Sequence, residues 1–242
     1  MGDDGTDRRT FLKQALAGGV CAAAAMSGCM RLATEKGGRV EYLGARVIPG
    51  SPTDHGVPVL LVAVDDDGYV IGRPPTEGAH LYCAQKDADL GARLFEDPGD
   101  ERLRYDLSGE KLAAHGAETF WYSEHNGEPV HVDHFADRPL LTGASVRWRG
   151  GPEGQDGATL ILLKLDPDKI EGAGPAQIFA NDHGLVAFSD LCTHFCCRAG
   201  WHEDEIARTY DAWDTIFCTC HSARFDPQRV ERYTVNGRDD RP

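Results

Sequence analysis

Basic residues, and lysine above all, are scarce in this chain. Its 242 residues hold 25 lysines and arginines against 39 aspartates and glutamates, and only 6 of the bases are lysines. The resulting net charge of −14 repels a polyanion, so the composition argues against a nucleic-acid-binding protein. An acidic, lysine-poor surface is suited to high salt, where carboxylates stay hydrated, or to an ordinary extracellular setting.

Signatures of nucleotide binding and of hydrolysis are missing as well. No Gly-rich phosphate loop, no nucleophile elbow and no internal repeat appears in the sequence. Long helical patterns are few, and short apolar segments alternate with turns rich in Gly, Asp and Pro, which predicts an all-β fold. The predicted strands are residues 58–64, 120–122, 130–132, 144–149, 158–165, 177–180 and 185–189. Turns are expected at 65–68 and 181–184, and one or two helical turns at 109–115.

The chain divides into three parts. Residues 1–30 form a targeting segment, residues 31–57 a linker with one strand, and residues 58–242 a single domain. Pro49 and Pro52 mark the linker as irregular.

Two short segments near the C-terminus carry the chemistry. Residues 192–197 read CTHFCC and residues 218–221 read CTCH. Each offers one thiolate and one imidazole at close spacing, together with a spare cysteine, Cys197 or Cys220. Two cysteines and two histidines divided evenly between two loops suit a [2Fe–2S] cluster with one all-sulfur iron and one imidazole iron.

These segments resemble the two cluster boxes of Rieske iron–sulfur proteins, most closely the disulfide-bearing kind of cytochrome bc complexes, with boxes C-T-H-x-G-C and C-x-C-H. The resemblance implies an antiparallel β-sandwich with a cluster-binding region at about residues 177–227. It also implies a disulfide between Cys197 and Cys220. The implied ligands are Cys192 and Cys218 on one iron and His194 and His221 on the other. The acidic composition adds the expectation of a halophilic, haloarchaeal source.

A zinc site is the alternative, because zinc also takes two cysteines and two histidines. Zinc sites usually pair Cys with Cys at one knuckle and His with His at the other, whereas each loop here mixes the two. A second metal site at His131 and His134, near His125, is conceivable, although surface histidines explain this spacing better.

The boxes depart from the family pattern at several positions. Cys196 replaces the usual Gly, either as an inert buried thiol or as a competitor for the disulfide, and Cys83 is expected to be a small buried hydrophobe. Ala223 and Phe225 stand where high-potential members carry Ser and Tyr. Their missing hydroxyls predict a potential in the lower half of the Rieske range, suited to menaquinol, unless Ser222 compensates in part.

Two length differences accompany these substitutions. Residues 201–214, between the boxes, are acidic and are expected to form a surface excursion. Only 21 residues follow His221. The resemblance implies a covering Pro-rich loop there, so either a partner covers that side or the gene product is shortened.

The N-terminus resembles an export signal. Residues 7–13, DRRTFLK, are similar to the twin-arginine motif, and the apolar residues 15–30 follow. This segment is short for a membrane span, so an uncleaved anchor, lipidation at Cys29 within a lipobox-like MSGC, and cleavage all remain open. The expected location is the outer face of the cell membrane, where a disulfide can form.

The resemblance implies an oxidoreductase subunit rather than a stand-alone enzyme. It would take one electron from quinol at a cytochrome b partner, with a proton through His221, and pass the electron to an external cytochrome or copper protein. The alternative is an electron-transfer subunit of an exported arsenite- or nitrate-type oxidoreductase. A cytoplasmic oxygenase ferredoxin ranks last, because its boxes lack the spare cysteines.

Overall fold

The computed structural model describes residues 39–73, 101–106, 125, 127–148, 158–172, 182–202 and 205–236. Contacts divide the chain into a main unit, Glu41–Tyr233, and a small unit to which residues 39–40 and 234–236 belong among those described. Everything that concerns the ligand motifs lies in the main unit. The predictions at 109–115, 120–122 and 177–180 lie outside the described residues.

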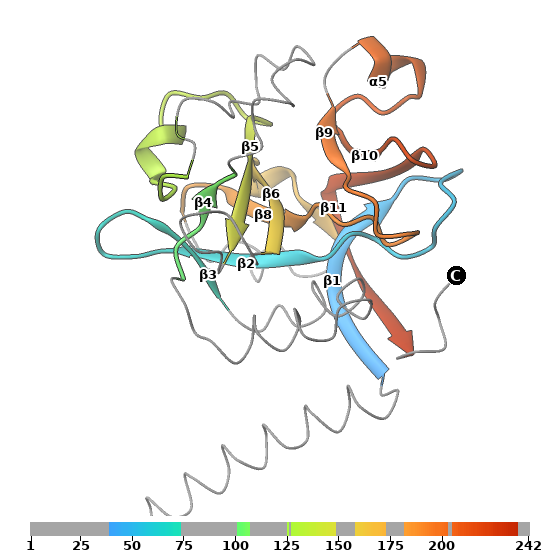
Figure 1. The fold of residues 1–242 in the computed structure, drawn as a ribbon, viewed down its shortest axis with the longest axis horizontal. Helices are drawn as coiled ribbons and strands as arrows, with labels where there is room; N and C mark the ends of the chain where they lie inside the picture. The colour runs from blue at the N-terminus through green and yellow to red at the C-terminus, as the bar shows by residue number, and fades with distance from the viewer. Residues whose placement is uncertain are drawn as a thin grey trace, which may run out of the picture. The chain divides into compact units, whose positions relative to one another are not determined.

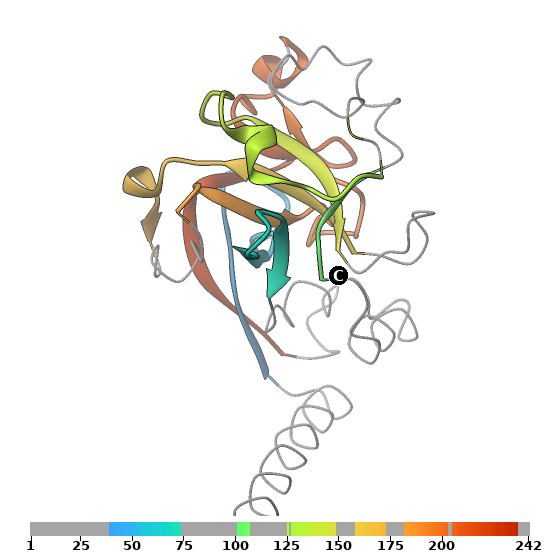
Figure 2. The ribbon, with the colours of Figure 1, turned by 90° about the vertical axis from the view of Figure 1, so that its left-hand side faces the viewer.

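The described strands form two sheets (Figure 1). One has the order β1-β11-β10-β9, and the short β7 pairs with β11 in parallel. The bounds in this sheet are β1 (Arg39–Val47), β7 (Glu171–Gly172), β9 (Gly200–His202), β10 (Thr215–Cys218) and β11 (Ala223–Asn236). Figure 2 shows β1 and the long β11 running next to each other.

The second sheet has the order β3-β2-β8-β6-β5-β4, and its pairings are antiparallel. Its bounds are β2 (Val59–Val64), β3 (Val70–Arg73), β4 (Arg104–Tyr105), β5 (Gly143–Trp148), β6 (Ala158–Lys164) and β8 (Leu185–Ser189). Three short helices complete the described elements: η3 (Val132–Phe135), η4 (Pro167–Lys169) and α5 (Glu205–Thr209). The architecture is therefore the all-β antiparallel sandwich that the sequence predicts.

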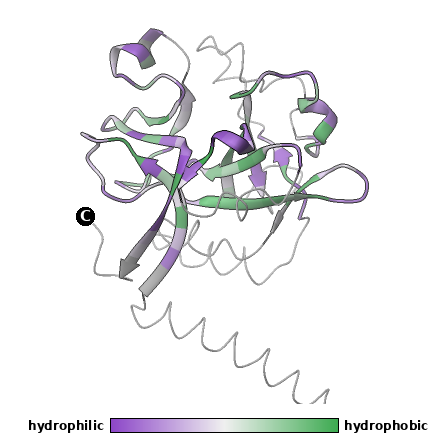
Figure 3. Ribbon diagram, turned by 180° about the vertical axis from the view of Figure 1, so that it is seen from behind, coloured by the Kyte–Doolittle hydropathy of each residue, from purple (hydrophilic) through white to green (hydrophobic). Residues whose placement is uncertain are grey.

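The uninterrupted apolar runs of β6 and β8 are explained by burial on both faces. Successive side chains of a strand point to opposite sides. Ile161 and Leu163 face the core between the two sheets, called here the sandwich core, whereas Leu160 and Leu162 face a second core on the other side. Figure 3 shows hydrophobic residues concentrated on the central strands and hydrophilic residues on outer loops. Each fully buried leucine or isoleucine contributes about 1.5–3 kcal/mol.

The predicted turn at 65–68 is confirmed. The Asp65 carboxylate accepts hydrogen bonds from the backbone N–H groups of Asp67 and Tyr69, at 3.0 and 2.8 Å. Gly68 has a φ of +88°, and a Cβ there would lie 2.4 Å from Nε2 of His131. A glycine is thus required for both backbone conformation and space.

Four predicted strands are confirmed as β2, β5, β6 and β8. The strand expected at 130–132 is wrong, because pairing there is limited to an isolated bridge and η3 begins at Val132. The His131 side chain accepts from the Asp133 N–H and caps η3, which ends the extended conformation. The surface excursion expected from residue 201 is wrong at its start, because Trp201 belongs to β9 and is only 5% exposed.

Candidate metal centre

Two loops carry the predicted ligands, and both are closed by backbone hydrogen bonds. In the first loop, the Cys192 N–H donates to the Cys197 carbonyl and the Cys196 N–H donates to the Cys192 carbonyl, each at 2.8 Å. Cys196 has a φ of +57°, which explains why the resemblance expects Gly here, since a non-glycine residue rarely adopts this conformation. The second loop is the turn between β10 and β11, which starts from the pair Cys218–Ala223.

The two predicted cysteine ligands meet in the sandwich core. Cys192 and Cys218 are each 1% exposed, and their sulfur atoms are hydrogen-bonded to each other. This bond is the main cause that lowers the pKa of Cys192 and raises the pKa of Cys218, and burial raises both. Both shifts have the same main cause, the single hydrogen bond that joins the sulfurs of the two loops.

Backbone N–H groups surround both sulfurs. Those of His194 and Phe195 point to the Cys192 sulfur, and those of Cys220 and His221 point to the Cys218 sulfur; each lowers the pKa of the thiol that it faces. Such N–H donors stabilise thiolates, the form in which cysteine binds a metal. Both loops are therefore built to present negatively charged sulfur.

The two predicted histidine ligands face each other across the loops. The rings of His194 and His221 lie 4.8 Å apart, centroid to centroid, at 87°. Nδ1 of His194 is buried and has no hydrogen-bond partner among the described residues. Burial, followed by the neighbouring His221, lowers the pKa of His194, which favours the neutral ring that a metal ligand requires. The His221 side chain is exposed, and Phe195, 44% exposed, packs against both rings.

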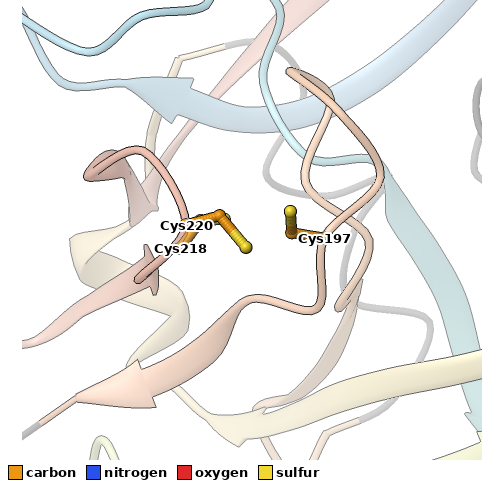
Figure 4. A group of neighbouring side chains, drawn as sticks. All are labelled: Cys197, Cys218 and Cys220. Carbon is orange, nitrogen blue, oxygen red and sulfur yellow. The ribbon is translucent and has the colours of Figure 1, made fainter.

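The spare cysteines also come together. The sulfurs of Cys197, Cys218 and Cys220 lie within 4.8 Å of one another, with Cys197 on one loop and the other two on the facing loop (Figure 4). Cys197 and Cys220 are free thiols, and their hydrogen bond raises the pKa of Cys197 to about 11. The disulfide between them stays a prediction.

Cys196 behaves differently from its neighbours. It is disulfide-bonded, whereas Cys197 and Cys220 are free. The interpretation of Cys196 as an inert thiol is therefore wrong. Cys83 lies outside the described residues.

The sequence alone did not indicate that a buried ion cluster supports the first loop. Arg198 binds Asp190 at 2.7 Å and Asp106 at 3.1 Å, and Arg147 binds Asp106 at 2.7 Å. Asp106 and Asp190 are buried, and Thr159 donates to Asp190 at 2.6 Å. Asp190 lies two residues before the first box and Arg198 directly follows it, and this closeness in sequence is the one signal that could have revealed their pairing.

The residues present fit a [2Fe–2S] cluster. Two buried sulfurs, a buried imidazole nitrogen with no partner among the described residues, and a second imidazole in contact with it supply two soft and two borderline ligands. The histidines near residue 131 do not form a comparable site. His125 and His134 stack at 4.0 Å, but among the described residues only the three cysteines of Figure 4 bring three potential ligand atoms within 4.8 Å.

Comparison with known proteins identifies the class. Residues 164–234, which contain both loops, match the Rieske [2Fe-2S] domain, so this part of the chain is a Rieske domain that binds a [2Fe–2S] cluster. Two curated relatives are the cytochrome bc1 complex Rieske iron-sulfur subunits of Streptomyces lividans and Streptomyces coelicolor. Each is 32% identical over 69 residues, which make up 28% of this chain and 35% and 17% of the respective relatives. No solved structure gives a significant match.

Proposed function

We propose that this chain is the electron-transfer subunit of a membrane quinol-oxidising complex of the cytochrome bc type. Cys192 and Cys218 hold one iron, and His194 and His221 hold the other. The chain acts as an oxidoreductase subunit, not as an enzyme by itself. The names of the two relatives favour this assignment, while the matched region spans about a third or less of their lengths.

The pair of facing histidines, carried by the same two loops as the two buried cysteines, supports the proposal most directly. A zinc knuckle pairs like with like, whereas each loop here contributes one sulfur and one imidazole. The cluster supplies one-electron chemistry at a potential of roughly −150 to +300 mV.

The chain's own residues supply the proton chemistry and exclude water. The sandwich core shields the two cysteine ligands and Phe195 packs against the histidine rings, whereas His221 is exposed. With one ring nitrogen on iron, the other nitrogen of His221 is left to receive the proton of a bound quinol. His221 is thus the residue that contacts the substrate.

The residues beside the second loop favour a potential in the lower half of that range. Ala223 and Phe225 are fully buried and carry no hydroxyl. Ser222, which carries the nearest hydroxyl in sequence, is exposed. A low-potential quinol such as menaquinol therefore suits this site.

The location of the chain belongs to the same proposal. Export of a folded domain by the twin-arginine route, followed by anchoring through the N-terminal segment or a lipid, places the cluster on the outer face of the membrane, beside a cytochrome b partner and an external cytochrome or copper acceptor. The motif concerned lies outside the described residues. Among those described, no helix has the length and apolar character of a membrane span.

Anaerobic purification from membranes tests the proposal. We expect iron and sulfide in equal amounts, a rhombic spectrum on reduction, and a cytochrome b that co-purifies. Zinc in place of iron would refute the cluster ligands. A molybdopterin subunit in place of cytochrome b would refute the complex while leaving the cluster intact.

A further inference from the structure

Residues 48–58 connect β1 to β2, and their course is fixed at both ends. The Ala45 N–H donates to the Val57 carbonyl at 2.9 Å, and the Ile48 N–H donates to the Arg224 carbonyl at 3.0 Å. Gly56 is buried, and a Cβ there would lie 1.9 Å from the Ala45 carbonyl oxygen. This segment, called here the tie loop, is packed closely against the sheet that holds the second ligand loop.

The tie loop binds β11 through Ser51, directly after the second ligand loop. The Ser51 hydroxyl donates to the Arg224 carbonyl at 3.2 Å and accepts from the Arg224 N–H at 3.0 Å. The Arg224 guanidinium in turn donates to the Pro49 carbonyl at 3.0 Å. Arg224 is three residues after His221 and neighbours Ala223, the pairing partner of Cys218.

The tie loop binds the first ligand loop two residues later. Thr193 stands between the ligands Cys192 and His194, is 2% exposed, and donates its hydroxyl hydrogen to the His55 carbonyl. The Thr53 hydroxyl lies 3.3 Å from that of Thr193 and also accepts from the His55 N–H. One turn of the tie loop thus contacts the centre of the first ligand loop.

Ser51 and Thr53 therefore connect the two ligand loops through a third segment. We propose that the tie loop is a positioning element of the cluster site, which holds the two ligand loops at the spacing that the cluster needs. The effect of the tie loop on the cluster rests on the function proposed above. Its effect on the spacing of the two ligand loops does not, because the tendency of Cys197 and Cys220 to form a disulfide measures that spacing without the cluster. Residues that orient metal ligands typically change affinity or activity by about 10–100-fold when they are removed.

The test uses the purified holoprotein and variants on either side of the tie. Ser51→Ala removes the contact with Arg224, and Thr193→Val removes the hydroxyl while keeping the shape of the side chain. Thr193→Ser keeps the hydroxyl and should rescue. Thr209→Ala, on α5, removes a hydroxyl that bonds only to the Glu205 carbonyl within the described residues, and serves as the control. Should Thr193→Val fail to fold, the part-buried pair Ser51→Ala and Thr53→Ala replaces it.

Two measurements are made on each variant. The first concerns the cluster: the rate of iron loss to a chelator, the rhombic spectrum of the reduced protein, and the reduction potential. The second is the equilibrium of the Cys197–Cys220 pair with glutathione, read by peptide mapping. In this exchange, the two thiols form one S–S bond, the S–S bond of oxidised glutathione breaks, and its two halves take up the two hydrogens.

We expect Ser51→Ala and Thr193→Val to lose iron about tenfold faster, with altered spectra. The disulfide equilibrium constant should fall by about tenfold, because the two thiols have a lower effective concentration. Thr193→Ser and Thr209→Ala should stay near wild type. Wild-type values for iron loss, spectrum and disulfide in both tie variants would overturn the proposal. If the wild-type protein lacks the rhombic signal, the proposed cluster is refuted. The glutathione equilibrium would then still test whether the tie loop sets the spacing of the two ligand loops.

Discussion

At the scale of single residues, the backbone supplies several of the hydrogen bonds that reach the two ligand sulfurs. Four N–H groups point to Cys192 and Cys218, and the side chains beside the second loop, Ala223 and Phe225, add none. Hydrogen bonds to sulfur stabilise the extra negative charge of the reduced state, so a hydroxyl added at one of these positions should raise the reduction potential.

Phe225→Tyr is the sharpest version of this change. We expect the potential to rise by roughly 60 mV, which for one electron corresponds to a tenfold change in the equilibrium constant. A spectroscopically monitored redox titration measures the shift. Phe225→Leu, which alters the ring without adding a donor, should leave the potential near that of the wild type. An unchanged potential in Phe225→Tyr would show that residue 225 does not reach the cluster.

His134 makes the stability of the second core depend on pH. Burial is the main cause that lowers its pKa, and the neighbouring His125 and His131 lower it further. At a pH just below 6.5, the ordinary pKa of histidine, the unfolded chain therefore binds a proton at His134 more readily than the folded protein does. The free energy of unfolding decreases as the pH falls from 6.5 toward the lower pKa of His134 in the folded state.

Chemical denaturation at about pH 7.5 and about pH 5.5 measures this loss. His134→Gln, which cannot take up the proton, should show a smaller difference in free energy of unfolding between the two conditions. His183→Gln, at an exposed turn position, is the matched control and should behave as the wild type does. An equal slope in His134→Gln and the wild type would contradict the prediction.

At the scale of elements, the buried ion cluster joins the first ligand loop to the second sheet. Arg198 closes the loop by pairing with Leu191, and its guanidinium reaches Asp190 and, beyond it, Asp106. Removing one partner from such a cluster leaves buried charge without compensation, which is costly even where the arginine itself is partly exposed.

Arg198→Met should lower the free energy of unfolding by about 2 kcal/mol, less than the 3–5 kcal/mol typical of fully buried pairs, because the Arg198 side chain is 45% exposed. Arg229→Met provides a close control, since Arg229 is also 45% exposed but pairs with the more exposed Glu171 and Asp226. Its cost should stay below about 1 kcal/mol. Equal costs for both variants in urea denaturation would contradict a special role of the buried partners.

The elements also show which features the sequence could predict. The apolar runs of β6 and β8 and the Asp-rich turn after β2 carry local signals, and each was predicted within a residue or two. The extended pairing expected at His131 was overridden by the helix cap that its own side chain forms. The spacing of Cys and His within each box is also a local signal, so the sequence was enough to predict a set of four ligands. By contrast, Asp106 lies 92 residues from Arg198, and Thr53 lies 140 residues from Thr193, so no local pattern could pair them.

At the scale of the whole molecule, the excess of negative charge predicts a dependence on salt. With a net charge of −14, mutual repulsion of carboxylates destabilises the folded state, and salt screens that repulsion. We expect the melting temperature to rise by roughly 5 °C between about 0.1 M and about 2 M potassium chloride.

Differential scanning calorimetry of the cluster-loaded protein measures this rise. Sucrose, which stabilises folded proteins by exclusion and does not screen charge, separates screening from a general solvent effect. A melting temperature that falls as potassium chloride is added would contradict the prediction, and would favour an ordinary extracellular protein over a halophilic one.

The burial of Cys192 and Cys218 has a consequence for biogenesis. Both residues belong to the sandwich core, alongside Ile216 and Phe225, so an iron carrier cannot reach their sulfurs while the two ligand loops are packed as described. Iron delivery therefore has to precede the packing of these loops or to require them to open again. An apoprotein whose ligand loops stay open exposes apolar residues of the core, and a delay in iron supply prolongs its exposure to aggregation.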